Sequence, residues 1–202
     1  MPLPRLFAKL PPPFAALFDP EAPWSLLGDP LTQILGDGTA IDPSARIHAS
    51  AVIEGPVFIG ANAEIRPGAF IRGGCWIGEG CVVGANTEVK RGIFLPGASA
   101  PHLNYVGDSI LGAKVGLGAG TILSNHRHDR ANVRIDGRDT GRRKLGAILG
   151  DGVLTGCGSV LHPGVVVGSE TRIYPGVHLR PGMVAERSIV KLRQELDIVA
   201  LG

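Results

Sequence analysis

The stretch from residue 41 to residue 95 reads IDPSARIHASAVIEGPVFIGANAEIRPGAFIRGGCWIGEGCVVGANTEVKRGIFL, and an aliphatic side chain returns in it at every sixth position. Neither an α-helix, with a period of about 3.6 residues, nor a simple strand, with a period of about 2, produces this spacing alone. A six-residue period is typical of a parallel β-helix, in which three hexapeptides form one coil. The matching positions are Ile41, Ile47, Ile53, Ile59, Ile65, Ile71, Ile77, Val83, Val89 and Leu95.

A second pattern supports inward packing at these positions. Four residues after most of the aliphatic positions comes a small or β-branched residue, so that both can point inward from one short strand and its turn. Two members of this second set are cysteines, Cys75 and Cys81, which we expect to be buried as small hydrophobic side chains. The set comprises Ala45, Ala51, Val57, Ala63, Ala69, Cys75, Cys81 and Thr87.

The same period returns further along the chain and extends the predicted β-helix over residues 39–185, or roughly seven to eight coils. Two interruptions separate the periodic parts. The first interruption lies between Leu95 and Leu111, whose separation of sixteen residues is not a multiple of six. The second is the segment of residues 124–147, which is polar and rich in arginine. We expect the second, residues 124–147, to leave the coil as a loop, where functional groups are commonly carried. The later matches are Leu111, Leu117, Leu123, Leu149, Thr155, Leu161, Val167, Ile173 and Leu179.

Both ends of the chain are predicted to be helical. Residues 1–38 are rich in proline and apolar residues, and the pairs Asp19-Pro20 and Asp29-Pro30 resemble helix starts. We expect this segment to cap the open edge of the first coil; a segment that docks a partner is the alternative. Residues 186–202 are expected to form a short amphipathic helix on the last coil. The N-terminal helices are expected near residues 14–18, 20–27 and 30–35.

Composition argues against several classes of protein. A formal net charge of +2 is too small to indicate nucleic-acid binding. No apolar run approaches the roughly 18 residues that span a bilayer, and three consecutive prolines, Pro11 to Pro13, interrupt the N-terminal stretch that could serve as a secretory signal. Three cysteines without such a signal indicate reduced thiols. These observations predict a soluble, cytoplasmic protein that contacts neither nucleic acid nor membrane.

One histidine stands in a setting that suggests chemistry. His102 lies in PHLNYVGDSILGAKVGLGAGTILSN, residues 101–125, beside a break in the period and among glycines that let a ligand approach the backbone. Histidine suits a general base near neutral pH. Arg66 precedes Lys90 by 24 residues, a little over one coil, and Lys90 precedes His102 by 12. One wall can therefore bring Arg66, Lys90 and His102 within reach of one small molecule. The alternative is that His102 is a surface or core residue without a chemical role.

Longer motifs carry a resemblance to a known family. VGANTEVKRGIFLPGASAPHLNYVGDSILGAKVGLGAGTILSN, residues 83–125, is similar to the acetyltransferase domain of the bifunctional glucosamine-1-phosphate acetyltransferase/N-acetylglucosamine-1-phosphate uridylyltransferases. GRRKLGAILGDGVLTGCGSVLHPGVVVGSETRIYPG, residues 141–176, resembles the archaeal-type sugar-1-phosphate nucleotidylyltransferases with an acetyltransferase half. The resemblance implies a left-handed β-helix and a homotrimer with active sites between subunits. It also implies acetyl-CoA as co-substrate, with no metal required.

The resemblance implies roles for single residues as well. His102 matches the catalytic base, which takes a proton from the sugar amine as that amine attacks the thioester. The N–H of Ala119 matches a donor that faces the acetyl carbonyl and stabilises the developing oxyanion. Cys157 stands where a serine lies near the acetyl-CoA site. The residues that match the sugar and phosphate contacts of the family are Arg66, Lys90, Tyr105, Asn125 and Lys144.

The chain departs from the bacterial pattern at three positions. Gly116 replaces an asparagine, His126 replaces a tyrosine, and Cys157 replaces the serine; the loop is also longer and more basic. The implied reaction is acetyl transfer to the amine of an amino-sugar 1-phosphate, glucosamine-1-phosphate or galactosamine-1-phosphate. Because the sequence contains no glycine-rich nucleotide loop, we expect a separate nucleotidyltransferase to activate the product.

Two other functions stay open. A non-catalytic β-helix module that docks a nucleotidyltransferase would account for the departures at Gly116 and His126. A zinc-dependent enzyme similar to carbonic anhydrase would need His126, His128 and His102 as three protein ligands. A run of three cations at the end of the loop either holds a phosphate group or forms a solvated face: Arg142, Arg143 and Lys144.

Overall fold

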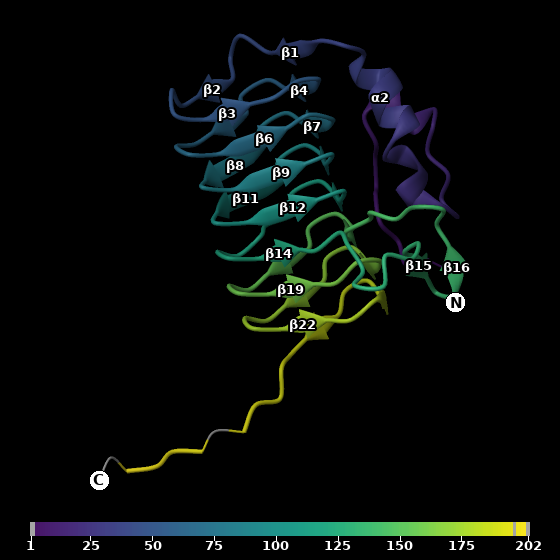
Figure 1. Ribbon diagram of the computed structural model, residues 1–202, viewed down its shortest axis with the longest axis vertical. Coiled ribbons are helices and arrows are strands. Elements are labelled where there is room, and N and C mark those ends of the chain that lie inside the picture. Colours follow the sequence, from purple (N-terminus) through teal and green to yellow (C-terminus); the bar gives the residue numbers. More distant parts are fainter. Residues whose placement is uncertain (1–2, 196, 201–202) are drawn as a thin grey trace.

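The computed structural model describes residues 3–195 and 197–200 and shows a stack of coils with three walls (Figure 1). Successive strands of the stack pass from one wall to the next, and strands one coil apart pair in parallel, as Val57–Ile59 does with Cys75–Ile77. This arrangement confirms the predicted parallel β-helix. The six-residue period produces it because each hexapeptide supplies one wall and turns the chain toward the next.

The first wall is one continuous sheet of eight strands. In spatial order it contains β1 (Thr39–Ile41), β4 (Val57–Ile59), β7 (Cys75–Ile77), β10 (Ile93–Phe94), β13 (Ile110–Leu111), β17 (Ile148–Leu149), β20 (Val165–Val167) and β23 (Gly182–Val184).

The other two walls carry most of the site residues predicted from the sequence. The second wall consists of β2 (Arg46–Ile47), β5 (Glu64–Ile65), β8 (Val82–Ala85), β11 (Ser99–His102), then β18 (Leu154–Thr155), β21 (Arg172–Ile173) and β24 (Ile189–Val190). Bridges from Gly116 to Ser99 and to Leu154 join its two parts. The third wall consists of β3 (Val52–Ile53), β6 (Phe70–Arg72), β9 (Glu88–Lys90), β12 (Tyr105–Gly107), β14 (Ile122–Leu123), β19 (Val160–Leu161) and β22 (His178–Leu179).

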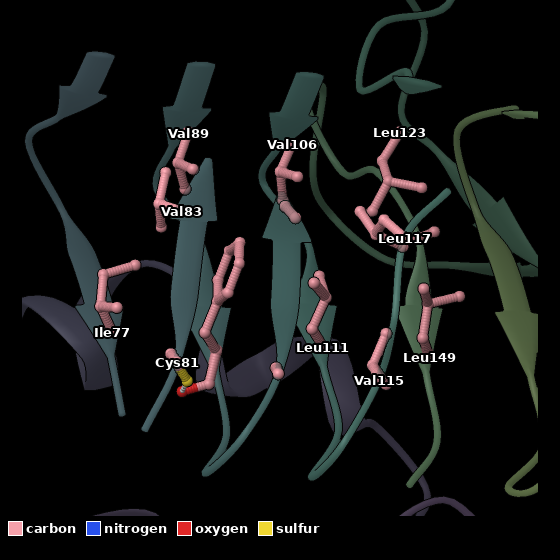
Figure 2. Packing of buried hydrophobic residues seen from close by; sticks show 14 of the residues in the cluster. Ile77, Cys81, Val83, Val89, Val106, Leu111, Val115, Leu117, Leu123 and Leu149 are labelled. Atoms are coloured by element: carbon pink, nitrogen blue, oxygen red, sulfur yellow. Dashed lines mark hydrogen bonds between the residues drawn. The ribbon is translucent and has the colours of Figure 1, made fainter. Parts of the chain in front are cut away.

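The core is a column of apolar side chains inside the coils (Figure 2). Ile77 and Leu111 stand in register on the first wall, while Val89 and Val106 do so on the third. Both cysteines expected in the core are there: Cys75 and Cys81 are fully buried, and burial raises the pKa of each thiol to about 12.

One interruption of the period is not a loop. Phe94, not the expected Leu95, continues the inward column in register with Ile77 and Leu111, while Leu95 packs on the outside of the wall. Only five positions separate Val89 from Phe94, and five separate Val106 from Leu111. The chain turns these two tight corners at Arg91 and Asp108, whose φ angles are 47° and 45°. The coil therefore continues here without a loop, and the repeat is one residue shorter than six at each of these two corners.

Residues 124–147, here called the basic loop, leave the coil between β14 and β17. The loop contains a hairpin of β15 (Arg134–Ile135) and β16 (Arg138–Asp139). The guanidinium of Arg138 donates a hydrogen bond to the Glu21 carbonyl at 2.9 Å and stands 5.5 Å from the centre of the Trp24 ring. The loop is thus fastened to the N-terminal part of the chain.

That N-terminal part, residues 3–36, is here called the strap. It contains α1 (Pro12–Ala15), the 3-10 helix η1 (Pro23–Leu26) and α2 (Asp29–Leu35), and it runs along the outer face of the first wall (Figure 1). The Phe14 ring lies edge-on to Trp76 of that wall at 5.1 Å. None of the helices in the described part of the chain is long and apolar enough to cross a membrane.

The expected cap over the first coil is therefore wrong. The strap covers a flank of the stack, while Ile41 and Ile47 of the first coil remain 44% and 36% exposed. The reason lies in the first wall, which is apolar on its outer face as well: Ile93, Ile110 and Ile148 point into the cluster that the strap completes. A sheet with two apolar faces needs cover on both.

The C-terminal helix expected over residues 186–202 is also wrong. Ile189–Val190 forms β24 and pairs with β21, and residues 191–195 and 197–200 contain no helix. Residues 196 and 201–202 of that prediction lie outside the described residues. The inward column of the β-helix continues through Val190, which is in register with Ile173 and packs against the core, and this outweighs the weak amphipathic pattern of the tail.

Candidate functional site

Three of the residues singled out in the sequence lie on successive coils along one edge of the prism. The Gly120 N–H donates to the His102 carbonyl at 3.0 Å, and the Gly158 N–H donates to the Ala119 carbonyl at 2.8 Å. In the same way the Gly176 N–H donates to the Cys157 carbonyl at 3.0 Å. His102, Ala119 and Cys157 therefore form a row, here called the histidine corner, where the second wall turns into the third.

His102 is the last residue of β11, and its side chain is exposed. Asn104, which is 3% exposed, fixes the backbone beneath it. The His102 N–H donates to the side-chain oxygen of Asn104 at 3.1 Å, and the Asn104 side-chain amide donates to the Gly118 carbonyl at 2.8 Å. Asn104 thus links the histidine to the next coil. Asn104 was not among the predicted site residues, although a polar residue at an inward position of the repeat was a visible signal.

A second group of candidate site residues lies where the third wall turns into the first. Arg72 and Lys90 are directly paired between β6 and β9, and Lys90 is paired with Gly107 of β12. Lys144, Arg72 and Arg91 all lie close enough to Lys90 to lower its pKa, although burial contributes most to that shift. These four cations, Arg72, Lys90, Arg91 and Lys144, are here called the cationic corner.

A buried carboxylate organises this corner. The Asp108 side chain is 2% exposed and accepts a hydrogen bond from Arg91 Nε at 2.7 Å. It also accepts one from the Asn125 side-chain amide at 2.6 Å. Hydrogen bonds to an ionised acceptor of this length are among the stronger ones in proteins. Asp108 therefore sets the positions of one cation and one amide, although no sequence motif had marked it as a site residue.

Tyr105 and Asn125 meet beside Gly107. A Cβ atom added at Gly107 would lie 2.7 Å from the Tyr105 hydroxyl and 2.5 Å from the Asn125 amide nitrogen. The glycine therefore leaves the room that both side chains occupy. Burial raises the pKa of Tyr105, and the neighbouring carboxylates of Glu88 and Asp108 raise it further. The tyrosine is thus a neutral hydroxyl near physiological pH, able to donate a hydrogen bond.

The structure does not bring Arg66 to Lys90. Arg66 follows β5 on the second wall, and its Nε donates to Glu64 at 2.8 Å. A complete coil in this part of the chain has 18 residues, so the partner of Lys90 is Arg72. A separation of 24 residues adds one hexapeptide to that coil and reaches a different wall. The expected triad of Arg66, Lys90 and His102 is therefore replaced by an arrangement that includes Arg72.

The histidine and cationic corners are the two ends of one short strand. β12 begins at Tyr105, shortly after His102, and ends at Gly107, next to Asp108. A small molecule lying along this part of the third wall can present an anion to the cations and another group to the imidazole. The arrangement can therefore bind an anion and accept a proton from the same molecule.

The histidines of the basic loop lie elsewhere. His126 and His128 line a cavity of about 490 Å³ together with His162, and His102 is not part of it. Within residues 3–195 and 197–200, no group of three or more histidine, cysteine, aspartate or glutamate side chains is placed to hold a metal ion. The zinc hypothesis, which needs His102 beside His126 and His128, gains no support from this geometry.

Comparisons with known proteins agree with the motifs. Residues 53–158 match the family model described as GMPPB C-terminal domain, and residues 146–181 match the model of the bacterial transferase hexapeptide, six repeats. The bifunctional sugar-1-phosphate nucleotidylyltransferase/acetyltransferase of Sulfurisphaera tokodaii is 44% identical over 73 residues, which is 34% of this chain and 18% of that protein. The bifunctional protein GlmU of Methanococcus aeolicus is 41% identical over 155 residues, covering 66% of this chain and 37% of that protein.

Among solved structures, a mutant of the N-acyltransferase AntD from Bacillus cereus, in complex with dTDP and coenzyme A, is 17% identical. That match has a TM-score of 0.43 and covers 72% of this chain and 76% of that one. The resemblance to the acetyltransferase part of the bifunctional proteins is confirmed, although this chain spans well under half the length of the two relatives just described. Since one family model covers more than half of its residues, the chain belongs to the GMPPB C-terminal domain family of hexapeptide-repeat proteins.

Proposed function

We propose that this protein is an acetyl-CoA-dependent N-acetyltransferase that acts on the amine of an amino-sugar 1-phosphate, glucosamine-1-phosphate or galactosamine-1-phosphate. The observation that carries the proposal is the placement of His102 and the cationic corner at opposite ends of β12. The row of His102, Ala119 and Cys157 along the histidine corner adds to it. The Sulfurisphaera tokodaii relative, which is named a nucleotidylyltransferase/acetyltransferase, points the same way.

His102 would act as the general base. Its exposed imidazole would take a proton from the amine while the amine nitrogen forms a bond to the thioester carbon. The carbon–sulfur bond then breaks, and His102 would return the proton to the departing thiolate, so that atoms and charge balance. Proton transfer by a positioned side chain contributes about 10²–10⁴-fold to such reactions. The Ala119 N–H would donate to the oxygen on which negative charge develops, and Cys157 would line the same cofactor path.

The acceptor would bind along the third wall. Lys90 and Lys144 would hold its phosphate, and Arg72 takes the place first expected for Arg66, because Arg72 is the arginine in register with Lys90. Tyr105 and Asn125 would contact the sugar ring from beside Gly107. Charge-assisted hydrogen bonds from several cations suit a phosphate monoester.

Assembly and partners follow the family resemblance. We infer a homotrimer, with each active site completed at the contact between subunits. The Sulfurisphaera tokodaii relative carries a nucleotidylyltransferase name, so a nucleotidyltransferase is the inferred partner for the next step. The alternative is a β-helix module that has lost catalysis and only docks such a partner, which the departures at Gly116 and His126 favour.

Coenzyme A release, followed with a thiol reagent, tests the proposal. Wild type and His102→Ala are compared with acetyl-CoA and, in turn, glucosamine-1-phosphate, galactosamine-1-phosphate and glucosamine. We expect turnover only with a phosphorylated sugar and a loss of at least about 100-fold in His102→Ala. His178→Ala removes another exposed histidine, from β22, and should turn over like wild type.

Two results would contradict the proposal. If His102→Ala keeps wild-type turnover, His102 is not the base. If no sugar supports turnover, while a nucleotidyltransferase binds the protein, the non-catalytic module replaces the enzyme. Because Cys157 is exposed and lies on the proposed cofactor path, the reagent is added only after the reaction is stopped, and a sample without sugar gives the background thiol.

A further inference from the structure

A cavity of about 510 Å³ lies between the strap, the basic loop and the cationic corner. The strap contributes Gly28 to its lining. This volume falls within the range of small-molecule sites, roughly 300–1,000 Å³. The remaining lining residues are Arg91 and Asp108 from the tight corners and Gly141, Arg142, Arg143 and Lys144 from the loop. We call this space the arginine cavity.

The charge of the arginine cavity is strongly positive. Its lining has four cationic side chains and a single carboxylate, Asp108. Asp108 is already occupied, since it accepts hydrogen bonds from Arg91 and from Asn125. Within the described part of the chain, neither Arg143 nor Lys144 forms an ion pair, so their charges have no partner there.

Arg142 is built into the wall of the cavity. A terminal nitrogen of its guanidinium donates to the Leu27 carbonyl of the strap at 2.7 Å. Its Nε is buried and has no hydrogen-bond partner among the described residues. A Cβ atom at Gly28 would lie 2.9 Å from the same guanidinium, so only glycine lets the strap pass this close. A loop arginine on a merely solvated face would not be held in this way.

The charges around Arg142 would favour an anion in the cavity. Burial lowers the pKa of Arg142, and the charge of Arg91 lowers it further, while Asp108 and Asp29 act in the opposite direction. An anion in the cavity would relieve the repulsion between the cations. Arginine guanidinium groups match phosphate oxygens with paired hydrogen bonds, and a phosphoryl group also fits the volume.

We propose that the arginine cavity is a phosphoryl-binding site, with Arg91, Arg142 and Arg143 as its ligands and the strap as one of its walls. The ligand is a phosphate monoester or a diphosphate. Such a group can come from a phosphorylated acceptor or from coenzyme A, and the chemistry that recognises it is the same. The site does not depend on the proposed acetyl transfer, because a phosphoryl group would bind here whether or not the protein is an enzyme.

Titration calorimetry with inorganic phosphate and with pyrophosphate, at constant ionic strength, tests the proposal. Arg143→Gln removes one exposed cation from the cavity without touching the strap. Arg130→Gln makes the same change in charge at an exposed position of the same loop, outside the cavity. We expect Arg143→Gln to weaken binding about tenfold, the effect of losing one charge-assisted contact, and Arg130→Gln to stay within about twofold.

Two outcomes would overturn the proposal: no binding of either anion by wild type, or an equal loss in both variants, which would indicate only a diffuse attraction to a basic face. Titrations of wild type and Arg143→Gln with glucosamine-1-phosphate and with coenzyme A then separate the two sources. The source is the one whose binding the substitution weakens. Phosphate binding that depends on Arg143, in a protein without acetyl transfer, would leave this site standing and remove the proposed function.

Discussion

Replacing Asp108 by asparagine probes the residue on which the cationic corner depends. The change keeps the shape of the side chain but removes its charge. One of its two positions then becomes an N–H donor, which faces either the Arg91 Nε donor or the Asn125 amide donor. Because the carboxylate is only 2% exposed, water cannot take over the lost acceptor.

The magnitude follows from the bonds that are lost. A hydrogen bond to a charged group contributes about 1.5–3 kcal/mol, and at least one of the two at Asp108 is lost. Breaking a fully buried ion pair costs about 3–5 kcal/mol of folding free energy. The loss here should be smaller, because Arg91 is 42% exposed and its guanidinium can turn to solvent. We expect a loss of about 2–3 kcal/mol, which lowers the Tm of a chain of this size by roughly 4–12 °C.

Thermal melts followed by circular dichroism measure this effect. Asp129→Asn is the matched control, because Asp129 also pairs with an arginine, Arg127, but on an exposed part of the basic loop. We expect no measurable change in Tm for the control. If Asp108→Asn melts at the wild-type temperature, or if both variants shift alike, the buried carboxylate does not organise the corner.

Three further predictions concern the site, the thiols and the strap. Gly107→Ala should raise the acceptor KM about tenfold and should also lower the Tm, because the new methyl group would displace both the Tyr105 hydroxyl and the buried Asn125 amide that donates to Asp108; an unchanged KM would contradict the proposed sugar contact. A thiol reagent should label one cysteine, Cys157, in the native protein and all three cysteines in denaturant. Labelling of a second cysteine in the native protein would refute the burial of Cys75 and Cys81 in the core. Phe14→Ala should lower the free energy of unfolding by about 3–5 kcal/mol, measured by urea titration, because its buried ring packs on Trp76; a change below about 1 kcal/mol would mean that the strap is loosely attached.

The repeat could be predicted from the sequence because the interior of a β-helix is itself periodic. Each coil places a side chain at the same inward position, so Ile77, Cys81 and Val83 follow directly from counting sixes. Counting failed where a wall is apolar on both faces. Phe94 and Leu95 are both large and buried, Phe94 inside the coil and Leu95 beneath the strap. Their residue types alone do not indicate which of the two points inward.

The site was harder to predict, because it depends on register between coils. His102, Ala119 and Cys157 could be named from the family motifs, but their alignment along one edge depends on bonds such as that from Gly120 to His102. Arg66 was named for its distance in sequence, while Arg72 stands beside Lys90 because one coil separates them. Asp108 carries no motif that marks it as the carboxylate beneath Arg91 and Asn125.

The position of the strap restricts how copies of this protein can meet. A three-sided prism has three flat faces for side-by-side contact, and the strap and the basic loop together cover the first of them. Neighbouring copies that keep their straps in place are left with the second and third walls. Those two faces share one edge, and that edge carries His102. Subunits that join through the free faces would therefore come together around the imidazole.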